Sequence, residues 1–341
     1  MKMKFGVATG RNERIDEIAS TSRLADDLGY SHLTFIDSQN LSRDVYSMMA
    51  IAAANSNKIM IGHGVTNTTT RHPAATANAT ATIDELSGGR AFLGLGVGMS
   101  STGTMGMNPK PMDELKEMLT FFRSYMRGEE ATYKGSTMSS EWVRRPVPVF
   151  VGAEGPRSLQ LCGQLADGVI STAVDPTFIK WKLELMEKGA RKAGRDPSTI
   201  ELWPRTMCYV AESKEAARRE VQSYCATNAT AVYFSVFKYN TPEANDLKER
   251  LGPQILEDIK KAHDAYQYYA HERTDAPHGK AVTQRLIDFF MLTGTPDDIC
   301  EQIEKMGKIG VKTVSMPLYT IIDKKGMMRE IHSKVMTRFR G

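Results

Sequence analysis

Small and polar residues cluster at four points of the chain, each directly after a short apolar run. The clusters are Asp37-Ser38-Gln39, Gly64-Val65-Thr66-Asn67, Gly96-Val97-Gly98, and Gly152 with Gly155-Pro156-Arg157-Ser158. Because the carboxyl ends of parallel barrel strands converge, we expect these clusters to form one pocket. Glycines allow a flat molecule to approach the backbone, whose N–H groups can then bind ring heteroatoms. The pattern therefore predicts a site for a planar ligand.

The residues from Gly155 to Ser158 have the composition of an anion site. They lead into a predicted helix, whose free N–H groups and dipole favour negative charge at its start. Arg157 adds a guanidinium, a group that binds phosphate well. An ordinary turn with a helix cap explains the same residues equally well, so both interpretations stay open.

The glycine run Gly94-Leu95-Gly96-Val97-Gly98 is similar to part of a dinucleotide-binding fingerprint. Its third glycine position is Met99 or Ser101, depending on the frame, and neither a helix nor an acidic residue follows at the expected distance. Nicotinamide binding is therefore disfavoured. The motifs of P-loop proteins, zinc proteases and serine hydrolases do not occur, so no metal site is predicted.

Histidines and cysteines add little predicted chemistry. His63 lies within a predicted strand, and His72 precedes Pro73 at a helix start, where capping or packing suits it better than proton transfer. His271 and His278 lie in a long insertion, and the sequence does not show whether they or His72 reach the pocket. The four cysteines are far apart and are expected to be buried, reduced thiols: Cys162, Cys208, Cys225 and Cys300.

The composition is that of an ordinary globular chain. Of 341 residues, 41% are hydrophobic and 25% charged, which is enough for a large core. The net charge of +4 comes from 44 basic and 40 acidic residues that are interspersed, so a nucleic-acid partner is not supported. No apolar run reaches the roughly 18 residues of a membrane span, and the N-terminus lacks a signal-peptide core, so we expect a cytoplasmic protein.

Short β-branched runs that alternate with helical segments must position the clusters, and this alternation is typical of parallel βαβ units. Eight units favour a closed (β/α)8, TIM-like barrel over an open sheet of about five or six strands, with residues 1–341 forming one domain. The expected strands are 4–8, 32–36, 59–63, 91–95, 148–151, 168–171, about 200–210, and 313–316.

Cap residues mark the predicted helix boundaries. Gly29 suits the end of the first helix and Pro73 the start of the third, while Thr295 and Asp298 form a capping-box-like pair before the last. The expected helices include 15–28, 44–54, 73–88, 112–126 and 296–309, with further helices starting at 155 and 175.

The stretch between the seventh and eighth strands, about 214–292, is too long for one crossover helix. It contains helical runs at 215–224 and 256–269. Its aromatic residues are expected to be core: Tyr233, Phe234, Phe237 and Tyr239. We predict a helical insertion beside the barrel mouth, or an oligomer contact.

A set of longer motifs extends along nearly the whole chain. They include Phe35-Ile36-Asp37-Ser38-Gln39, Ile61-Gly62-His63-Gly64-Val65-Thr66-Asn67, Arg71-His72-Pro73-Ala74, Ile83-Asp84-Glu85-Leu86-Ser87-Gly88-Gly89-Arg90-Ala91, Leu93-Gly94-Leu95-Gly96-Val97-Gly98, Gly155-Pro156-Arg157 and Gly294-Thr295-Pro296. In these motifs the chain resembles the bacterial luciferase-like family of flavin and deazaflavin oxidoreductases. It is most similar to the branch with the methylenetetrahydromethanopterin reductases.

The resemblance implies a ring of the flavin or deazaflavin type across the strand ends, with its phosphate in the loop at 155–158. It also implies a non-proline cis peptide bond against the ring, which by position is Gly64-Val65. The polar edge of the ring would then face Asp37, Ser38, Thr66 and Asn67.

The chain departs from its relatives at two positions where they handle protons. Some relatives carry a histidine after the second strand, where this chain has Ser38-Gln39, and others an acid after the fourth-strand glycines, where it has Met99. Neither role carries over. Asp37, Ser38 and Gln39 are the remaining candidates for catalysis, and Met99 predicts an apolar wall near the ring.

The resemblance leads to three functional hypotheses. We favour a two-component monooxygenase that uses reduced FMN and O2 to oxidise a small organic substrate. A separate flavin reductase would supply the reduced FMN. The alternative is a coenzyme F420-dependent reductase or dehydrogenase that transfers a hydride. A hypothesis of another class is a non-catalytic flavin-binding protein. The segment 100–109, rich in Gly, Ser and Met, is expected to be a mobile lid, and family likeness implies a homodimer.

Overall fold

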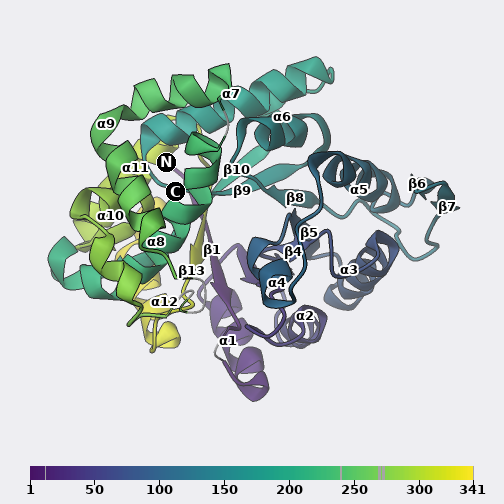
Figure 1. Ribbon diagram of the computed structural model, residues 1–341. Helices are drawn as coiled ribbons and strands as arrows, with labels where there is room; N and C mark the ends of the chain where they lie inside the picture. Colours follow the sequence, from purple (N-terminus) through teal and green to yellow (C-terminus); the bar gives the residue numbers. More distant parts are fainter. Residues whose placement is uncertain (12, 239, 268–269, 271–272, 341) are drawn as a thin grey trace.

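Eight parallel strands close into a barrel surrounded by helices (Figure 1). The computed structural model describes residues 1–11, 13–238, 240–267, 270 and 273–340. The strand order is β3-β2-β1-β13-β10-β9-β8-β5, and β3 pairs with β5 to complete the circle, so the predicted fold is confirmed. The barrel strands are β1 (Lys4–Thr9), β2 (His32–Phe35), β3 (Met60–His63), β5 (Ala91–Gly96), β8 (Val149–Gly152), β9 (Gly168–Thr172), β10 (Glu201–Arg205) and β13 (Thr313–Pro317).

Helices follow the strands with the caps that the sequence indicates. Gly29 and Gly88 have φ values of 74° and 70°, which L-residues with side chains rarely adopt, and they end the first and third helices. Thr295 and Asp298 form the expected capping box. The helices around the barrel include α1 (Ile15–Asp27), α2 (Val45–Ala54), α3 (Pro73–Ser87), α5 (Met112–Tyr125), α6 (Pro156–Leu165), α7 (Pro176–Lys192), α11 (Pro296–Lys308) and α12 (Lys324–Lys334).

The prediction of a single seventh strand at about 200–210 is wrong, because this segment forms two separate strands. β10 ends at Arg205, and β11 (Cys208–Val210) pairs with β12 (Leu292–Gly294) in a separate sheet. The chain leaves the barrel at Thr206, whose backbone N–H still bonds Ser315 on β13 while its hydroxyl donates to the Phe290 carbonyl oxygen at 2.7 Å. Apolar runs lie on both sides of the break, Leu202-Trp203 before it and Met207-Cys208-Tyr209-Val210 after it, so the prediction joined them into one strand.

The insertion between β10 and β13 is helical, with longer helices than predicted. It consists of α8 (Lys214–Phe237), α9 (Pro242–Asp264), a 3-10 turn (Pro277–Ala281) and α10 (Gln284–Phe290). The aromatic residues are half-buried instead of fully buried: Tyr233 and Phe237 pack against the core, and Tyr233 stacks on His263 of α9 with ring centroids 3.7 Å apart. Phe234 contacts the rings of Tyr233 and His263. Tyr239 lies outside the described residues.

Several small elements were not predicted. A hairpin of β6 (Ala131–Tyr133) and β7 (Ser136–Met138) precedes β8, and two residues, β4 (Thr66–Asn67), extend the line of β3. The segment predicted as a mobile loop begins in α4 (Met99–Thr104), a short helix. All four cysteines are buried and unpaired, as expected. Among the described residues, no helix combines the length and apolar character that a membrane crossing requires.

Two histidines are fully buried inside the barrel. His32 stacks on Trp203 with ring centroids 4.2 Å apart, and it occupies the space left by Gly6, where an added Cβ would lie 1.9 Å from its Nε2. His63 lies on β3 with no exposed surface, in keeping with the structural role expected for it. Burial disfavours the charged form of both rings, and it lowers the pKa of His32 to about 3 and that of His63 to about 4.

Acidification is expected to weaken the fold through these histidines. The unfolded chain, with histidine pKa values of about 6.5, takes up protons before the folded chain does. The free energy of unfolding therefore has its full value above about pH 6.5 and decreases as the pH is lowered further. Near pH 5 the decrease is about 1.4 kcal/mol per pH unit for each histidine. Urea denaturation between about pH 7 and pH 5 checks this, with His32→Gln expected to show a decline shallower by about that amount. Parallel declines in the two proteins would contradict the burial effect.

Candidate active site

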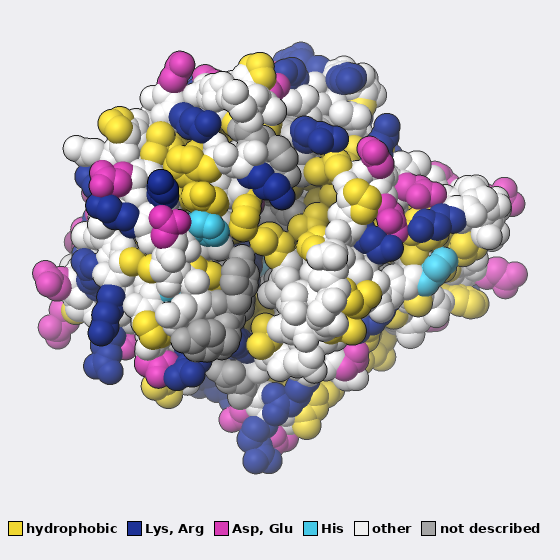
Figure 2. All heavy atoms as spheres, in the orientation of Figure 1, with side chains coloured by type: hydrophobic (Ala, Val, Ile, Leu, Met, Phe, Trp, Pro, Cys, Tyr) yellow, Lys and Arg dark blue, Asp and Glu magenta, His cyan; other side chains and the backbone are white. Residues whose placement is uncertain are grey.

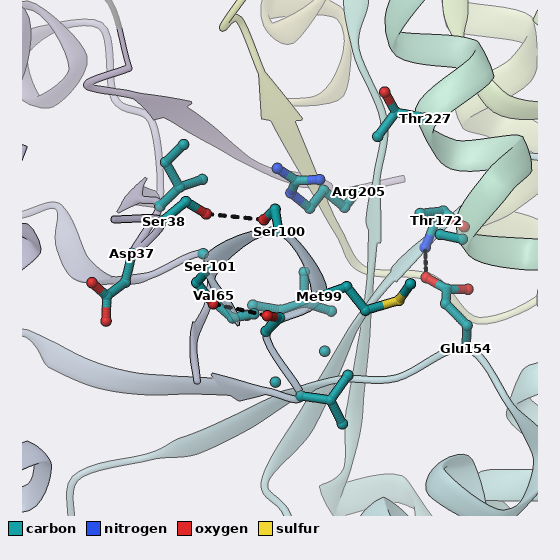
Figure 3. A pocket seen from close by; sticks show the side chains of 18 of the residues that line it. Asp37, Ser38, Val65, Met99, Ser100, Ser101, Glu154, Thr172, Arg205 and Thr227 are labelled. Atoms are coloured by element: carbon teal, nitrogen blue, oxygen red, sulfur yellow. Dashed lines mark hydrogen bonds between the residues drawn. The ribbon is translucent and has the colours of Figure 1, made fainter. Parts of the chain in front are cut away.

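A cavity of about 260 Å³ opens at the carboxyl ends of the barrel strands. Figure 2 shows a hollow in this face with hydrophobic side chains gathered around it, and Figure 3 shows the lining from close by. Eight of the fifteen predicted site residues line it: Asp37, Ser38, Gly64, Val65, Gly96, Val97, Gly98 and Gly152. The other seven are not part of the lining: Gln39, Thr66, Asn67, Gly155, Pro156, Arg157 and Ser158.

Val65 forms a bulge on the barrel side of the cavity. The Gly64-Val65 peptide bond is cis, as predicted. Three glycines on the neighbouring strands leave room for the bulge. An added Cβ at Gly96 would lie 2.7 Å from Val65, one at Gly152 would lie 3.3 Å from it, and one at Gly94 would lie 2.0 Å from the carbonyl oxygen of His63. The glycine run on β5 therefore accommodates this bulge.

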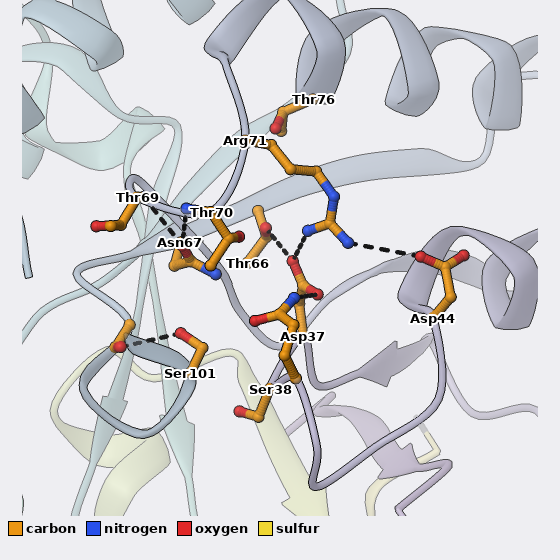
Figure 4. A network of polar contacts seen from close by, with 12 residues as sticks. Asp37, Ser38, Asp44, Thr66, Asn67, Thr69, Thr70, Arg71, Thr76 and Ser101 are labelled. Carbon is orange, nitrogen blue, oxygen red and sulfur yellow. Dashed lines mark hydrogen bonds and ion pairs between the residues drawn. The ribbon is translucent and has the colours of Figure 1, made fainter. Parts of the chain in front are cut away.

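Asp37 lies at the edge of the cavity and at the centre of a polar network (Figure 4). One carboxylate oxygen accepts hydrogen bonds from Arg71 and, at 2.6 Å, from the Thr66 hydroxyl, and the other accepts from the Gln39 amide at 2.7 Å. Burial, the largest single effect, acts to lower the pKa of Arg71, but the charge and hydrogen bond of Asp37 together with Tyr46 and Asp44 outweigh it, and the pKa is raised. Asp37 is 3% exposed, so these internal contacts leave it little access to a bound molecule.

The partners of Asp37 hold the strand ends in place instead of facing a ligand. Thr66 and Gln39 donate to its carboxylate, and Asn67 accepts from the backbone N–H groups of Thr69 and Thr70 at 2.9 and 2.8 Å. The sequence identified these residues correctly as polar strand ends. It did not show that Thr66 and Gln39 would bond Asp37 while Asn67 bonds backbone, because that depends on how two strands meet.

The predicted anion site in the loop after β8 lies outside the cavity lining. Gly155 and Pro156 begin α6, and the Ser158 hydroxyl donates to the Gly155 carbonyl oxygen at 2.8 Å. Arg157 is exposed and lies outside the lining. The start of α6 keeps its free N–H groups, while the loop presents Gly152 and Glu154 to the cavity.

Helix α4 covers one side of the cavity. Gly98, with φ of 74°, turns the chain into it, and Met99 lines the cavity, so the apolar wall predicted there is present. The Ser100 hydroxyl lies 3.0 Å from that of Ser38, and the Thr104 hydroxyl donates to the Gln39 carbonyl oxygen at 2.8 Å. Residues 100–104 of the segment expected to be a mobile lid thus belong to a short helix attached to the loop after β2.

Several lining residues were missed by the sequence analysis. Arg205 ends β10, donates to the Tyr224 hydroxyl and lies over the rings of Tyr224 and Tyr319, with guanidinium-to-centroid distances of 5.6 and 5.5 Å. The insertion supplies Thr227 and Thr230 from α8. The insertion does lie beside the barrel mouth, as predicted. Arg205 was obscured by the misplaced strand end, whereas the threonines carry no sequence signal.

The structure also places the remaining histidines. His72 caps α3, where its Nδ1 accepts from the Ala74 backbone N–H at 3.2 Å, which confirms the capping interpretation. His278 is buried beside Ser223, 3.2 Å from its hydroxyl, and it is not part of the cavity lining. His271 lies outside the described residues.

Comparison with known proteins agrees with this geometry. A profile described as "Luciferase-like monooxygenase" matches residues 2–313. A 5,10-methylenetetrahydromethanopterin reductase of Methanolobus tindarius is 31% identical over 319 residues, covering 92% of this chain and 93% of that protein. Its likeness spans the barrel and the insertion together.

Two solved structures share the fold over almost their whole length. The coenzyme F420-dependent tetrahydromethanopterin reductase of Methanopyrus kandleri superposes with a TM-score of 0.76, at 24% identity and full coverage of both chains. The FMN-bound oxygenating constituent of 3,6-diketocamphane monooxygenase from Pseudomonas putida gives 0.65, at 17% identity and 99% coverage of both. With its closed barrel, its bulged third strand and this profile match, the chain belongs to the luciferase-like monooxygenase family and is an oxidoreductase.

Proposed function

We propose that the protein is a coenzyme F420-dependent oxidoreductase that exchanges a hydride with a small organic substrate. The observation that carries the proposal is the 31% identity, over 92% of the chain, to a reductase of the methylenetetrahydromethanopterin type. The solved structure of such a reductase is named as F420-dependent and shares this fold throughout. These relatives support hydride transfer better than they support the oxygen-dependent reaction favoured from the sequence.

The residues of the cavity fit a flat polar ring. The hydroxyl oxygens of Thr172 and Thr230 are buried in the cavity lining, and neither finds a hydrogen-bond partner among the described residues. Buried hydroxyls without a partner are costly, so a ligand that bonds them is favoured. Gly96 and Gly152 expose backbone beside Val65, where a planar molecule can lie close.

When bound, the deazaflavin ring supplies two-electron chemistry, in which a hydride from a substrate C–H bond and a proton are taken up together, or both are returned. The chain contributes positioning. Val65 supports one face of the bound molecule, Met99 and Val97 exclude water, and the threonine hydroxyls orient its polar edge. The two acids of the described lining, Asp37 and Glu154, are both engaged in ion pairs, with Arg71 and Lys182.

A second candidate is the FMN-dependent monooxygenase. The diketocamphane enzyme, which has the same fold and is in complex with FMN, favours it. A separate flavin reductase belongs to this candidate alone, since oxygen chemistry needs a supply of reduced FMN. A homodimer stays a prediction from family likeness, and light scattering on the purified protein tests it.

Titration of the purified protein with F420, FMN and reduced FMN is expected to separate the candidates. F420 should bind at least about tenfold more tightly than FMN in either redox state, a difference of about 1.4 kcal/mol. Ring fluorescence reports both affinities, and NADH serves as the control that should not bind. Tighter binding of reduced FMN would instead support the monooxygenase. Binding of F420 without hydride exchange across a panel of alcohols and imines would leave only the non-catalytic hypothesis.

A further inference from the structure

A fully buried ammonium group lies directly behind the cavity wall. Lys182 of α7 has no exposed surface, and its three N–H groups have three acceptors: Glu154 Oε2 at 2.6 Å, the Ser171 hydroxyl at 2.7 Å and the Thr172 carbonyl oxygen at 2.7 Å. The ring of Phe178 lies 4.0 Å from Nζ. Lys182 therefore ties the loop after β8 to the end of β9, and it does not touch the cavity itself.

Packing alone does not explain a lysine at this position. Helix α7 already buries Phe178, Ile179, Trp181 and Leu185 against the core. Burial lowers the pKa of Lys182 by disfavouring its charged form. An apolar side chain generally serves the stability of such a site as well as a buried ion pair does. The positive charge of Lys182 therefore indicates a role in positioning its partner, the carboxylate of Glu154.

Glu154 is the cavity-facing member of the pair. Its Oε1 accepts the Thr172 backbone N–H at 2.7 Å, and its side chain is 19% exposed, against none for Lys182. Figure 3 shows it beside Thr172 at one side of the cavity, away from Asp37 and Ser38. Ser171 shares its single proton between Glu154 and the Ala153 carbonyl oxygen. A carboxylate has about four acceptor sites, so Glu154 retains capacity for a donor from the cavity.

The position of Glu154 in the chain indicates which donor that is. It stands between Gly152, which lies beside the Val65 bulge, and Gly155, which begins the helix proposed to hold the phosphate. In both F420 and FMN, the group between ring and phosphate is a polyol chain. Its hydroxyls are hydrogen-bond donors, and an ionised carboxylate is an acceptor only.

We propose that Glu154 accepts a hydrogen bond from a polyol hydroxyl of the cofactor, and that Lys182 is a positioning residue that holds this carboxylate in its orientation. The inference rests on the proposed function, because it assumes that the cavity takes a ring with a polyol tail. It assigns a cofactor contact to Glu154, and it gives Lys182 the role of positioning that residue.

The test compares the full-length wild type with Glu154→Gln, Lys182→Met and the double variant. Lys180→Met is the matched control, because Lys180 is an exposed lysine of the same helix. The probes are F420, FMN and a ring-only analogue without the polyol, lumiflavin or its 5-deaza counterpart, chosen to match the ring system that the wild type binds. Fluorescence gives each Kd, and the thermal midpoint of each variant is measured in parallel.

Each single variant should weaken binding of the polyol-bearing cofactor by about tenfold, since a charge-assisted bond is lost or misdirected. Binding of the ring-only analogue should change by less than about twofold, and the double variant should be no weaker than Glu154→Gln alone. Equal losses for both probes, an unchanged Kd in Glu154→Gln, or losses that multiply in the double variant would overturn the inference. A wild type that binds neither F420 nor FMN would instead overturn the proposed function.

Discussion

Replacing Gly94 with alanine is expected to lower the free energy of unfolding by on the order of 3 kcal/mol, because the new methyl group has no space. An added Cβ at Gly94 would lie 2.0 Å from the carbonyl oxygen of His63, a backbone atom that cannot rotate away. The end of β3 must then shift, and it carries Val65 with it. Cofactor affinity should therefore fall by at least about tenfold, or about 1.4 kcal/mol. Chemical denaturation and fluorescence titration measure the two effects.

Gly103→Ala provides the matched control. Gly103 lies in α4, close to the same cavity, but an added Cβ there meets no atom within 4 Å. Because alanine is the better helix former, this variant should be unchanged or more stable by up to about 1 kcal/mol. If both alanine variants behave like the wild type, the tight fit between β3 and β5 is not what the structure indicates.

Asp37→Ala should lower the free energy of unfolding by about 3 kcal/mol, because it leaves three donors without their shared acceptor. These donors are the Arg71 guanidinium, the Thr66 hydroxyl and the Gln39 amide. The segments after β2 and β3 that carry these donors form one side of the cavity, so cofactor affinity should also decrease. Urea denaturation at neutral pH gives the first quantity.

The control for this variant is Asp44→Ser, on the other side of the same guanidinium. Asp44 lies 3.5 Å from Arg71, is about half exposed and caps α2, a role that serine also fills. The expected change is within about 0.5 kcal/mol, as is usual for an exposed ion pair. Equal losses in the two variants would show that Arg71, and not the buried Asp37 network, determines the effect.

The barrel and half of the site were predictable because both depend on local patterns. Glycines such as Gly29 and Gly88 end helices for backbone reasons, and strand ends turn from apolar to polar within two or three residues. The family resemblance, not any local pattern, placed the cis peptide bond at Gly64-Val65. What fails is any statement about which polar side chains face one another.

Lys180 and Lys182 show this limit most clearly. They flank Trp181 on the same helix, yet one is exposed and the other is fully buried. Helical spacing separates the two, because Lys182 lies four residues after Phe178 and three before Leu185 on the buried face, whereas Lys180 lies on the opposite face. It does not show what a buried ammonium group would pair with. Only the meeting of α7 with the ends of β8 and β9 brings a carboxylate within 2.6 Å of Lys182. Thr227 and Thr230 are hidden for the same reason, since the insertion reaches the cavity from far along the chain.

The cavity is assembled from two sources that differ in their freedom to change. The barrel strands supply the Val65 bulge and its surrounding glycines, where a single added methyl group would crowd the His63 carbonyl oxygen or Val65 itself. Helix α8 supplies Thr227, Thr230 and Ala231, cavity-lining positions on one crossover segment, of which Thr230 is buried and the other two are half-buried. Mutational drift in that segment can reshape the opposite wall without disturbing the bulge. Directed evolution aimed at new reactants is therefore best confined to α8, with the strand ends kept as they are.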